Sequence, residues 1–278
     1  MLSTEMIRKI ESFVYSQPRS VDEIAKHISK NWRTADRYIQ SIEKDYGTLS
    51  VKVFRGGSRG ALKIVFWASV EKASHSVFQE NLEHDILSGR KKEDFAGFDI
   101  FQHIPNENKK AHMEYSVAND FNDLEQFADV MRTAKKQLLI FSGNLSFSNL
   151  KNKKIDLYKI MEELVKKGIS IKIICRIDMA GLENIERVLS LNFKYGKELV
   201  EIHHKEQPLR AVISDNKSMI IKEIKEPTGK VHELNKRIFI FYSIKDREWC
   251  DWLSKIFWKM FSSSIDAKKR IEEMHRLK

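Results

Sequence analysis

Apolar residues recur with a helical period in the first 45 residues of the chain. Residues 20–28 open with Ser20 and carry Glu23 three positions later, the arrangement of a capping box that begins a helix. A short turn follows, and residues 32–44 form a second predicted helix with Asn31 as its N-cap. At 100° per residue, Ala35, Ile39 and Ile42 share one stripe, which we expect to pack on the preceding helices. The pattern predicts a helix-turn-helix.

The opposite stripe of residues 32–44 carries long hydrogen-bond donors. Its members are Arg33, Arg37, Gln40 and Lys44. Arg, Gln and Lys are the residue types that reach guanine edges, adenine edges and phosphates in a major groove. We therefore predict that this helix contacts DNA, with Trp32 and Thr34 at its start as further contacts. Trp32 has an alternative role in partly exposed packing, and Tyr38 is expected to belong to the core.

A β-hairpin is predicted directly after this helix. Residues 49–54 and 61–67 are strand-like, and the turn between them is rich in glycine. The predicted DNA contacts of this turn are Arg55, Ser58 and Arg59. Residues 1–70 hold 12 Lys and Arg against 7 Asp and Glu, about half of the chain's positive excess.

Residues 1–68 resemble the winged helix-turn-helix domains of archaeal transcription regulators. The resemblance lies in Ile24-Ala25-x-x-Ile28, in Ala35-x-x-Tyr38-Ile39-x-x-Ile42 and in the wing Arg55-Gly-Gly-Ser-Arg-Gly. It implies double-stranded DNA as the partner. Because operators usually mirror a protein's twofold axis, we also expect a homodimer, with a helix over residues 69–87 as one candidate interface. The alternative is a protein-interaction module whose basic face is merely solvated.

Helices and strands alternate from residue 119 onward. The predicted strands cover 137–142, 170–176, 200–203, 209–214, 218–224 and 237–244, and the predicted helices cover 123–135, 155–167, 182–191 and 246–263. Several strands are apolar along their length, which is typical of a sheet covered on both faces. We expect an α/β domain over 119–264, a connecting helix and linker over 69–118, and a charged, solvated tail over 265–278.

The order of these elements resembles the phospholipase D-like domain, which also follows a winged helix in the TrmB family of archaeal sugar-responsive regulators. Active members carry His, any residue, Lys, any four residues and Asp. The matching positions here are Pro208, Arg210 and Asp215. Proline has no nucleophile, so the resemblance implies a non-catalytic domain. Shifting the motif to His203-x-Lys205 places Arg210 where the acid should be.

Polar residues near the ends of the later strands form a candidate effector pocket, because open α/β sheets bind ligands there. They are His203, His204, Lys205, Arg210, Asp215 and Lys222. The alternative is surface charge, with Arg210 and Asp215 joined in an ion pair. We expect no cofactor and no metal, since two adjacent histidines alone are a poor metal site.

The composition agrees with a phosphate-rich partner. The 278 residues carry a net charge of +10. Cys175 and Cys250 are too few for a disulfide framework, and neither a membrane span nor a signal-peptide core is evident, so we expect a cytoplasmic protein without a membrane partner.

The sequence as a whole predicts a DNA-binding transcription regulator with a silent effector or dimerisation domain. A phospholipase D-type phosphodiesterase or nuclease acting on DNA is the alternative, and a protein-interaction scaffold is a third hypothesis. The apolar face of the last long helix is assigned to the core or to a dimer interface; it comprises Trp249, Trp252, Leu253, Ile256, Phe257 and Met260.

Overall fold

The computed structural model describes residues 2–55, 61–68, 76–115, 124–227 and 236–276. The chain divides into two compact units, residues 1–73 and 74–278. The described residues include no helix long and apolar enough to cross a bilayer.

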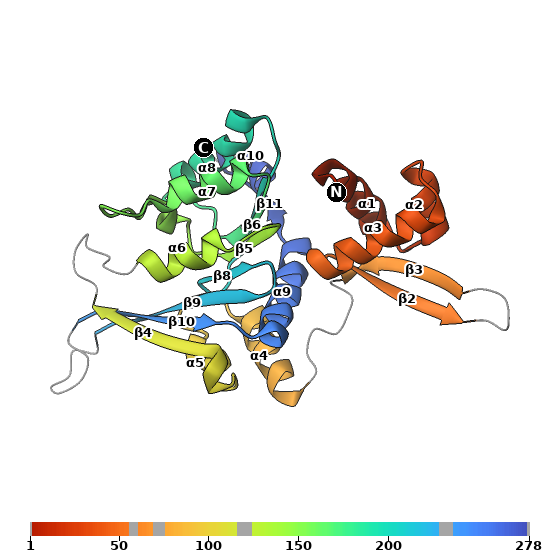
Figure 1. Cartoon of the computed structure of the whole chain (residues 1–278). Helices are drawn as coiled ribbons and strands as arrows, with labels where there is room; N and C mark the ends of the chain where they lie inside the picture. The colour runs from red at the N-terminus through yellow and green to blue at the C-terminus, as the bar shows by residue number, and fades with distance from the viewer. Residues whose placement is uncertain (1, 56–60, 69–75, 116–123, 228–235, 277–278) are drawn as a thin grey trace. The chain divides into compact units, whose positions relative to one another are not determined.

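Unit 1 consists of three helices and a small antiparallel sheet. In chain order the elements are α1 (Thr4–Ser16), β1 (Arg19–Ser20), α2 (Val21–His27), α3 (Trp32–Asp45), β2 (Leu49–Arg55) and β3 (Ala61–Trp67). The strands lie in the order β1-β3-β2, and the helices lie on one side of the hairpin (Figure 1). Ser20 and Glu23 form the predicted capping box at the start of α2. Apolar residues from all three helices and from the hairpin make one core.

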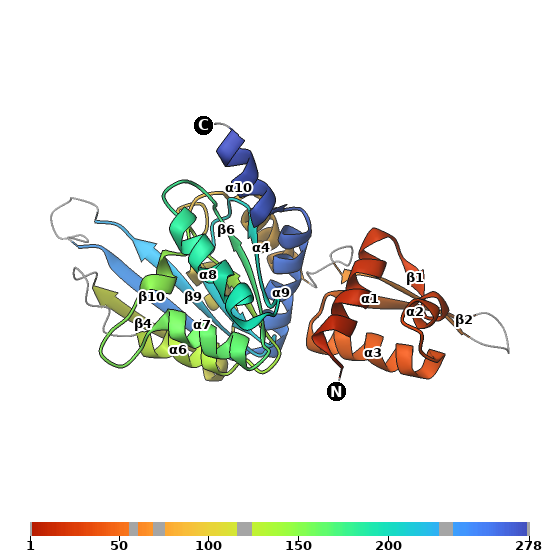
Figure 2. The same ribbon diagram turned by 90° about the horizontal axis from the view of Figure 1, so that it is seen from above.

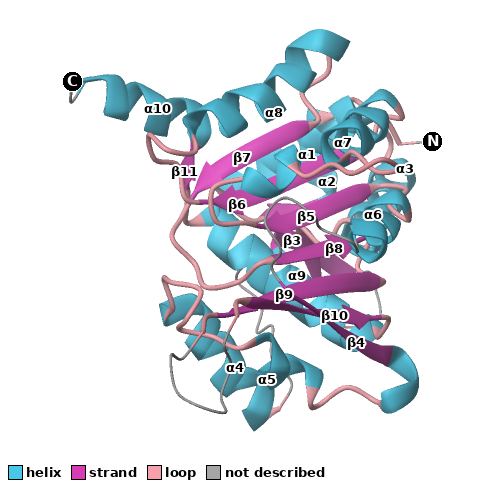
Figure 3. Cartoon of the chain, turned by 90° about the vertical axis from the view of Figure 1, so that its left-hand side faces the viewer, coloured by secondary structure: helices cyan, strands magenta, loops and turns pink. Residues whose placement is uncertain are grey.

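Unit 2 is built on an eight-stranded mixed sheet with the order β11-β7-β6-β5-β8-β9-β10-β4 (Figure 3). The three strands β5 (Gln137–Phe141), β6 (Ser170–Cys175) and β7 (Val200–His204) are parallel. The others pair antiparallel with their neighbours: β4 (Lys109–Tyr115), β8 (Ala211–Ser214), β9 (Ser218–Lys225), β10 (Ile238–Ile244) and β11 (Ile265–Asp266).

Helices cover both faces of this sheet, which confirms the predicted α/β class for this part of the chain. One face carries α6 (Leu124–Arg132), α7 (Leu157–Lys166) and α8 (Leu182–Tyr195), and the other carries α9 (Arg247–Ser262) (Figure 2). The short helix α5 (Gly97–Phe101) packs on β9 and β10, and α4 (Val77–Ser88) packs on α9. Every residue of β5 is buried, as expected for a strand between two helical layers. The six apolar residues of α9 singled out above are buried within the unit.

Two segments differ from their predicted roles. Residues 76–115 contribute α4, α5, a 3₁₀ turn (Asn106–Asn108) and edge strand β4 to unit 2. The sequence suggested a connecting helix over 69–87, within which most of α4 falls, and a linker after it, where the structure has α5 and β4. The tail also packs on unit 2, because β11 pairs with β7 and α10 (Ala267–Arg276) buries Ala267 and Met274. In α10 the charged residues lie on the outer side, so the average composition of the tail concealed the apolar residues that unit 2 covers. In α4 the buried side includes Gln79 and Glu83, which a hydrophobic pattern does not reveal.

Candidate functional sites: an exposed helix face and a cationic cavity

Helix α3 has two opposite faces. Ala35, Ile39 and Ile42 have no accessible surface. The opposite side chains are all exposed; they are Arg33, Arg37, Gln40 and Lys44, and we call them the donor face. The structure therefore places the four predicted donors together on the outside of unit 1.

An ion pair that the sequence reasoning missed joins α3 to the hairpin. Lys63 on β3 donates from Nζ to both carboxylate oxygens of Asp36, each at 2.8 Å. Asp36 Oδ2 also accepts from Gln40 Nε2 at 2.9 Å. A second link runs from the backbone N–H of Val51 to Glu43 Oε1 at 3.0 Å. The position of Asp36 beside Arg37 and Gln40 was the available signal, since a carboxylate there would repel DNA unless a cation neutralised it.

The other residues predicted to contact DNA lie at the start of α3 and in the predicted hairpin turn. Trp32 is 39% exposed, with Lys63 Nζ 5.2 Å from its ring centre, and Thr34 is half-buried at the capped start of α3. Tyr38 packs against the core, as expected. Arg55 is the last residue of β2, and Ser58 and Arg59 lie outside the described residues.

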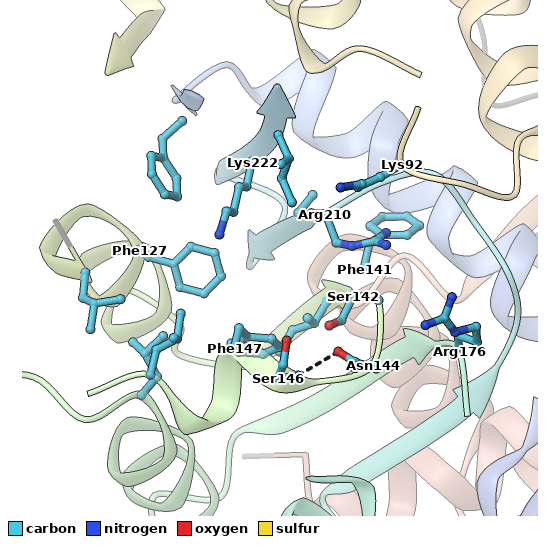
Figure 4. Close-up of a pocket in the computed structure, with 18 of the residues that line it drawn as sticks. Lys92, Phe127, Phe141, Ser142, Asn144, Ser146, Phe147, Arg176, Arg210 and Lys222 are labelled. Atoms are coloured by element: carbon cyan, nitrogen blue, oxygen red, sulfur yellow. Dashed lines mark hydrogen bonds between the residues drawn. The ribbon is translucent and has the colours of Figure 1, made fainter. Parts of the chain in front are cut away.

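Unit 2 contains a cavity of about 220 Å³ beside the carboxyl end of β5 (Figure 4). One part of its lining is apolar and includes Leu124, Phe127, Phe147, Leu150, Leu157, Ile224 and Phe241. The other part is polar and contains four cations, one carboxylate and a serine-rich turn: Lys92, Arg176, Arg210, Lys222, Glu114, Ser142, Gly143, Asn144 and Ser146.

Arg210 lies just before β8, and its guanidinium packs on the backbone at Gly143. Its Nη1 donates to the carbonyl of Leu209 at 2.7 Å. A Cβ added to Gly143 would come within 3.0 to 3.2 Å of the guanidinium atoms, so a larger residue here would crowd Arg210 in its present position. Burial, together with the charge of Arg176, lowers the pKa of Arg210. The site therefore holds the guanidinium in place at a cost in solvation.

Lys222 on β9 extends into the cavity toward Phe127 (Figure 4). Its Nζ lies 3.8 Å from the ring centre of Phe239, a cation–π contact. Burial lowers the pKa of Lys222 to about 8, against a smaller opposing effect of Glu114. An anion beside Lys222 would favour its charged form.

The turn after β5 is held by hydrogen bonds from several elements. Gln207 Nε2 donates to the carbonyl of Ser142 at 2.8 Å, and the backbone N–H of Arg176 donates to the carbonyl of Gly143 at 2.7 Å. Ser142 Oγ accepts from the backbone N–H of Leu145, which has a left-handed φ of 59°. The polar lining of the cavity is thus positioned before any ligand arrives.

The structure separates the six residues of the predicted effector pocket. Arg210 and Lys222 line the cavity, whereas the other four do not. His203 Nδ1 lies 2.9 Å from Ser264 Oγ and its ring stacks on Phe261. His204 Nδ1 accepts from the backbone N–H of Ile177, and Lys205 donates to Ser263.

Asp215 lies at the opposite end of β8 from Arg210. Its carboxylate accepts three backbone hydrogen bonds of 2.7 to 3.0 Å, from the N–H groups of Lys135, Lys136 and Gln137. The alternative of an Arg210–Asp215 ion pair is therefore wrong, because a strand separates the two side chains. The sequence reasoning missed Lys92, Arg176 and the turn after β5, since these residues reach the cavity from three other segments.

No protein-family model matches the chain, and no curated protein does. Among solved structures, the chain is similar to TrmBL2, described as an archaeal chromatin protein with a novel mode of DNA binding, at 14% identity over 96% of this chain and 95% of that one, with a TM-score of 0.39. It is also similar to Nuc from Salmonella typhimurium, a phospholipase D family member, at 11% identity over 57% of this chain and 97% of that one. NucT from Helicobacter pylori has the same identity over 57% of this chain and 99% of its own; the TM-score is 0.39 for both.

Proposed function

We propose that the protein is a DNA-binding transcription regulator in which unit 1 is a winged helix-turn-helix and unit 2 is a non-catalytic phospholipase D-like domain. The observation that carries this proposal is the donor face of α3, exposed along a helix whose other side is completely buried. A groove-reading helix needs both properties, because its core face must fix it while its outer side chains meet base edges.

The electrostatics of unit 1 support the same role. The carboxylate of Asp36 is paired with Lys63, so it does not face a phosphate backbone as an uncompensated charge. Neither Arg33, Arg37 nor Lys44 has an acidic side chain within 4 Å among the residues described. These cations are therefore available to replace the counterions of DNA.

The surroundings of the degenerate motif support a non-catalytic unit 2. Pro208 is buried at the position of the family's nucleophile, and Arg210 replaces its lysine. His203 and His204 are engaged by residues outside the cavity, and Asp215 serves the backbone of the loop before β5. We also propose that the regulator is a homodimer, because DNA half-sites are commonly related by a twofold axis.

Genome-wide capture of DNA fragments by the purified full chain tests the proposal. We expect one enriched sequence motif, and an affinity for it that falls steeply with salt, because each phosphate contact releases counterions. Absence of DNA retardation at low salt would overturn the proposal and favour a protein-interaction module. A second experiment incubates the protein with plasmid and with a phosphodiester dye. Cleavage by the wild type that is lost in His203→Ala would show that the protein is a phosphodiesterase and not a regulator.

A further inference from the structure

We propose that the cavity of unit 2 binds a small organic phosphate whose body is apolar. This inference deepens the effector part of the proposed function by naming the chemistry of the ligand. The binding itself does not depend on DNA, so the two can fail separately.

The charges around the cavity favour an anion. Four cationic side chains line it against one carboxylate, Glu114. Two of the cations at its edge have carboxylate partners outside the lining: Lys92 pairs with Glu226 at 2.6 Å and Arg176 with Asp178 at 2.7 Å. Lys222 and Arg210 extend inward and share the lining with Glu114, so these three groups together carry one net positive charge.

Arg210 in particular is prepared for an anion. In the described parts of the chain no carboxylate lies within salt-bridge distance of it, and its hydrogen bonds go to the carbonyls of Leu209 and Gln207. These bonds use Nη1, while Nη2 and Nε lie beside Gly143 at the cavity wall. A guanidinium presents several donors in a fixed plane, a geometry that matches phosphate oxygens.

The turn after β5 adds neutral donors at the same end of the cavity. The Oγ of Ser142 accepts from Leu145 and can donate its own hydrogen. Asn144 Oδ1 accepts from the backbone N–H of Ser146 at 3.3 Å, which directs the amide of Asn144 (Figure 4). Hydroxyl and amide donors beside the guanidinium of Arg210 suit a phosphate better than a carboxylate, which offers fewer oxygens.

The apolar part of the lining determines the other end of the ligand. Phe127 on α6 and Phe147 in the turn Ser146–Asn149 pack tilted against each other with ring centres 5.6 Å apart. Leu150, Leu157 and Phe241 complete this wall. At about 220 Å³ the cavity is smaller than typical drug-sized sites of about 300–1,000 Å³, so we expect a single ring or a short chain as the body of the ligand.

Isothermal titration calorimetry of the full chain tests this site, with phenyl phosphate, inorganic phosphate, benzoate and phenol as probes. We expect phenyl phosphate to bind most tightly, and we expect Lys222→Met and Arg210→Met each to weaken it about tenfold or more. Lys217→Met is the matched control, because Lys217 is exposed in the β8–β9 turn at the other end of the same hairpin, and it should leave the affinity unchanged.

Each contrary result overturns a stated part of the proposal. Failure of phenyl phosphate to bind, or unchanged affinity in both cavity variants, removes the site. If inorganic phosphate binds as tightly as phenyl phosphate, the ligand does not need an apolar body. If benzoate binds more tightly than phenyl phosphate, the ligand is a carboxylate and not a phosphate. Thermal unfolding shows whether each variant is folded. If Arg210→Met does not fold, the affinity of Lys222→Met for phenyl phosphate decides the test. DNA retardation on the same preparations reports separately on the proposed regulator.

Discussion

The donor face of α3 and the cavity of unit 2 use the same kinds of side chain in opposite surroundings. Arg33, Arg37 and Lys44 are exposed on a helix, whereas Arg210 and Lys222 are half-buried, and Lys222 lies beside aromatic rings. Burial lowers the pKa of both cavity cations. Exposed cations attract an anion from a distance, but salt screens this attraction. Burying a cation in a cavity costs solvation free energy, and the buried cation then interacts strongly with a small anion that enters.

This difference indicates which partner each region suits. An extended polyanion such as DNA can meet several exposed cations at once without dehydrating them fully. A small anion must offset the cost of burying charge by making close hydrogen bonds, and only the cavity positions its donors for that. The two regions can therefore be separated by experiment.

Removing cations from the donor face should have the largest effect. We expect the double variant Arg33→Ala/Arg37→Ala to lose about 3 kcal/mol or more of binding free energy for its operator, since a base or phosphate contact contributes about 1–3 kcal/mol. Phenyl phosphate binding should not change. Fluorescence anisotropy with labelled DNA measures the loss, with Lys9→Ala on the exposed side of α1 as the control. Equal losses in Lys9→Ala and in the double variant would contradict a specific role for the donor face.

Asp215 should prove to be a stabilising residue of unit 2 with no role in ligand binding. Asp215→Ala removes the acceptor of three backbone N–H groups and should lower the free energy of unfolding by about 3 kcal/mol. Asp215→Asn should lose less, because Asn keeps one acceptor oxygen and tolerates the residue's φ of 50°. Urea unfolding measures both. If an Asp215 variant has the stability of the wild type but no longer binds phenyl phosphate, Asp215 belongs to the ligand site.

Breaking the link between α3 and the hairpin should destabilise unit 1 moderately. In Lys63→Met the largely buried carboxylate of Asp36 loses its cation, which should cost about 1–3 kcal/mol of unfolding free energy. The double variant Lys63→Met/Asp36→Asn should recover part of that loss, because no uncompensated charge remains. Chemical denaturation of the four proteins of this cycle gives the coupling. Strict additivity would mean that the pair does not hold the hairpin.

The smallest effect should be a pH dependence confined to the cavity. Lys222 loses its proton as the pH rises through about 8, so the affinity for phenyl phosphate should fall severalfold between pH 7 and 9. A phosphate monoester is already largely dianionic at pH 7, and Glu114, Arg210 and Arg237 are the charged neighbours that act on Lys222. Calorimetry across this range measures the change, and Lys222→Met should show a nearly flat profile. DNA binding over the same range serves as the comparison.

The pKa of Lys222 also has a consequence for stability. The folded pKa lies below the ordinary value of 10.5, so unfolding takes up protons between about pH 8 and 10.5. The stability of the wild type relative to Lys222→Met should therefore rise with pH through this window. A difference that stays constant would mean that Lys222 titrates normally in the folded protein.

Local patterns in the sequence determined most of the secondary structure and the donor face. Capping residues and the stripe of Ala35, Ile39 and Ile42 define α3 within a few neighbouring positions, so its exposed side followed from period alone. The same applies to the apolar strands of unit 2. Helix and strand periods depend on residues close together in the chain, so they can be recognised from the sequence alone.

Only the tertiary structure decided which charges meet. The pairing of β10 with β4 brought residues 109–115 into the sheet, and the antiparallel pairing of β8 with β5 placed Arg210 beside the turn after β5. The cavity joins Lys92, Arg176, Arg210 and Lys222, which are up to 130 positions apart in the chain. Such contacts depend on strand order and direction, and neighbouring residues carry no record of either.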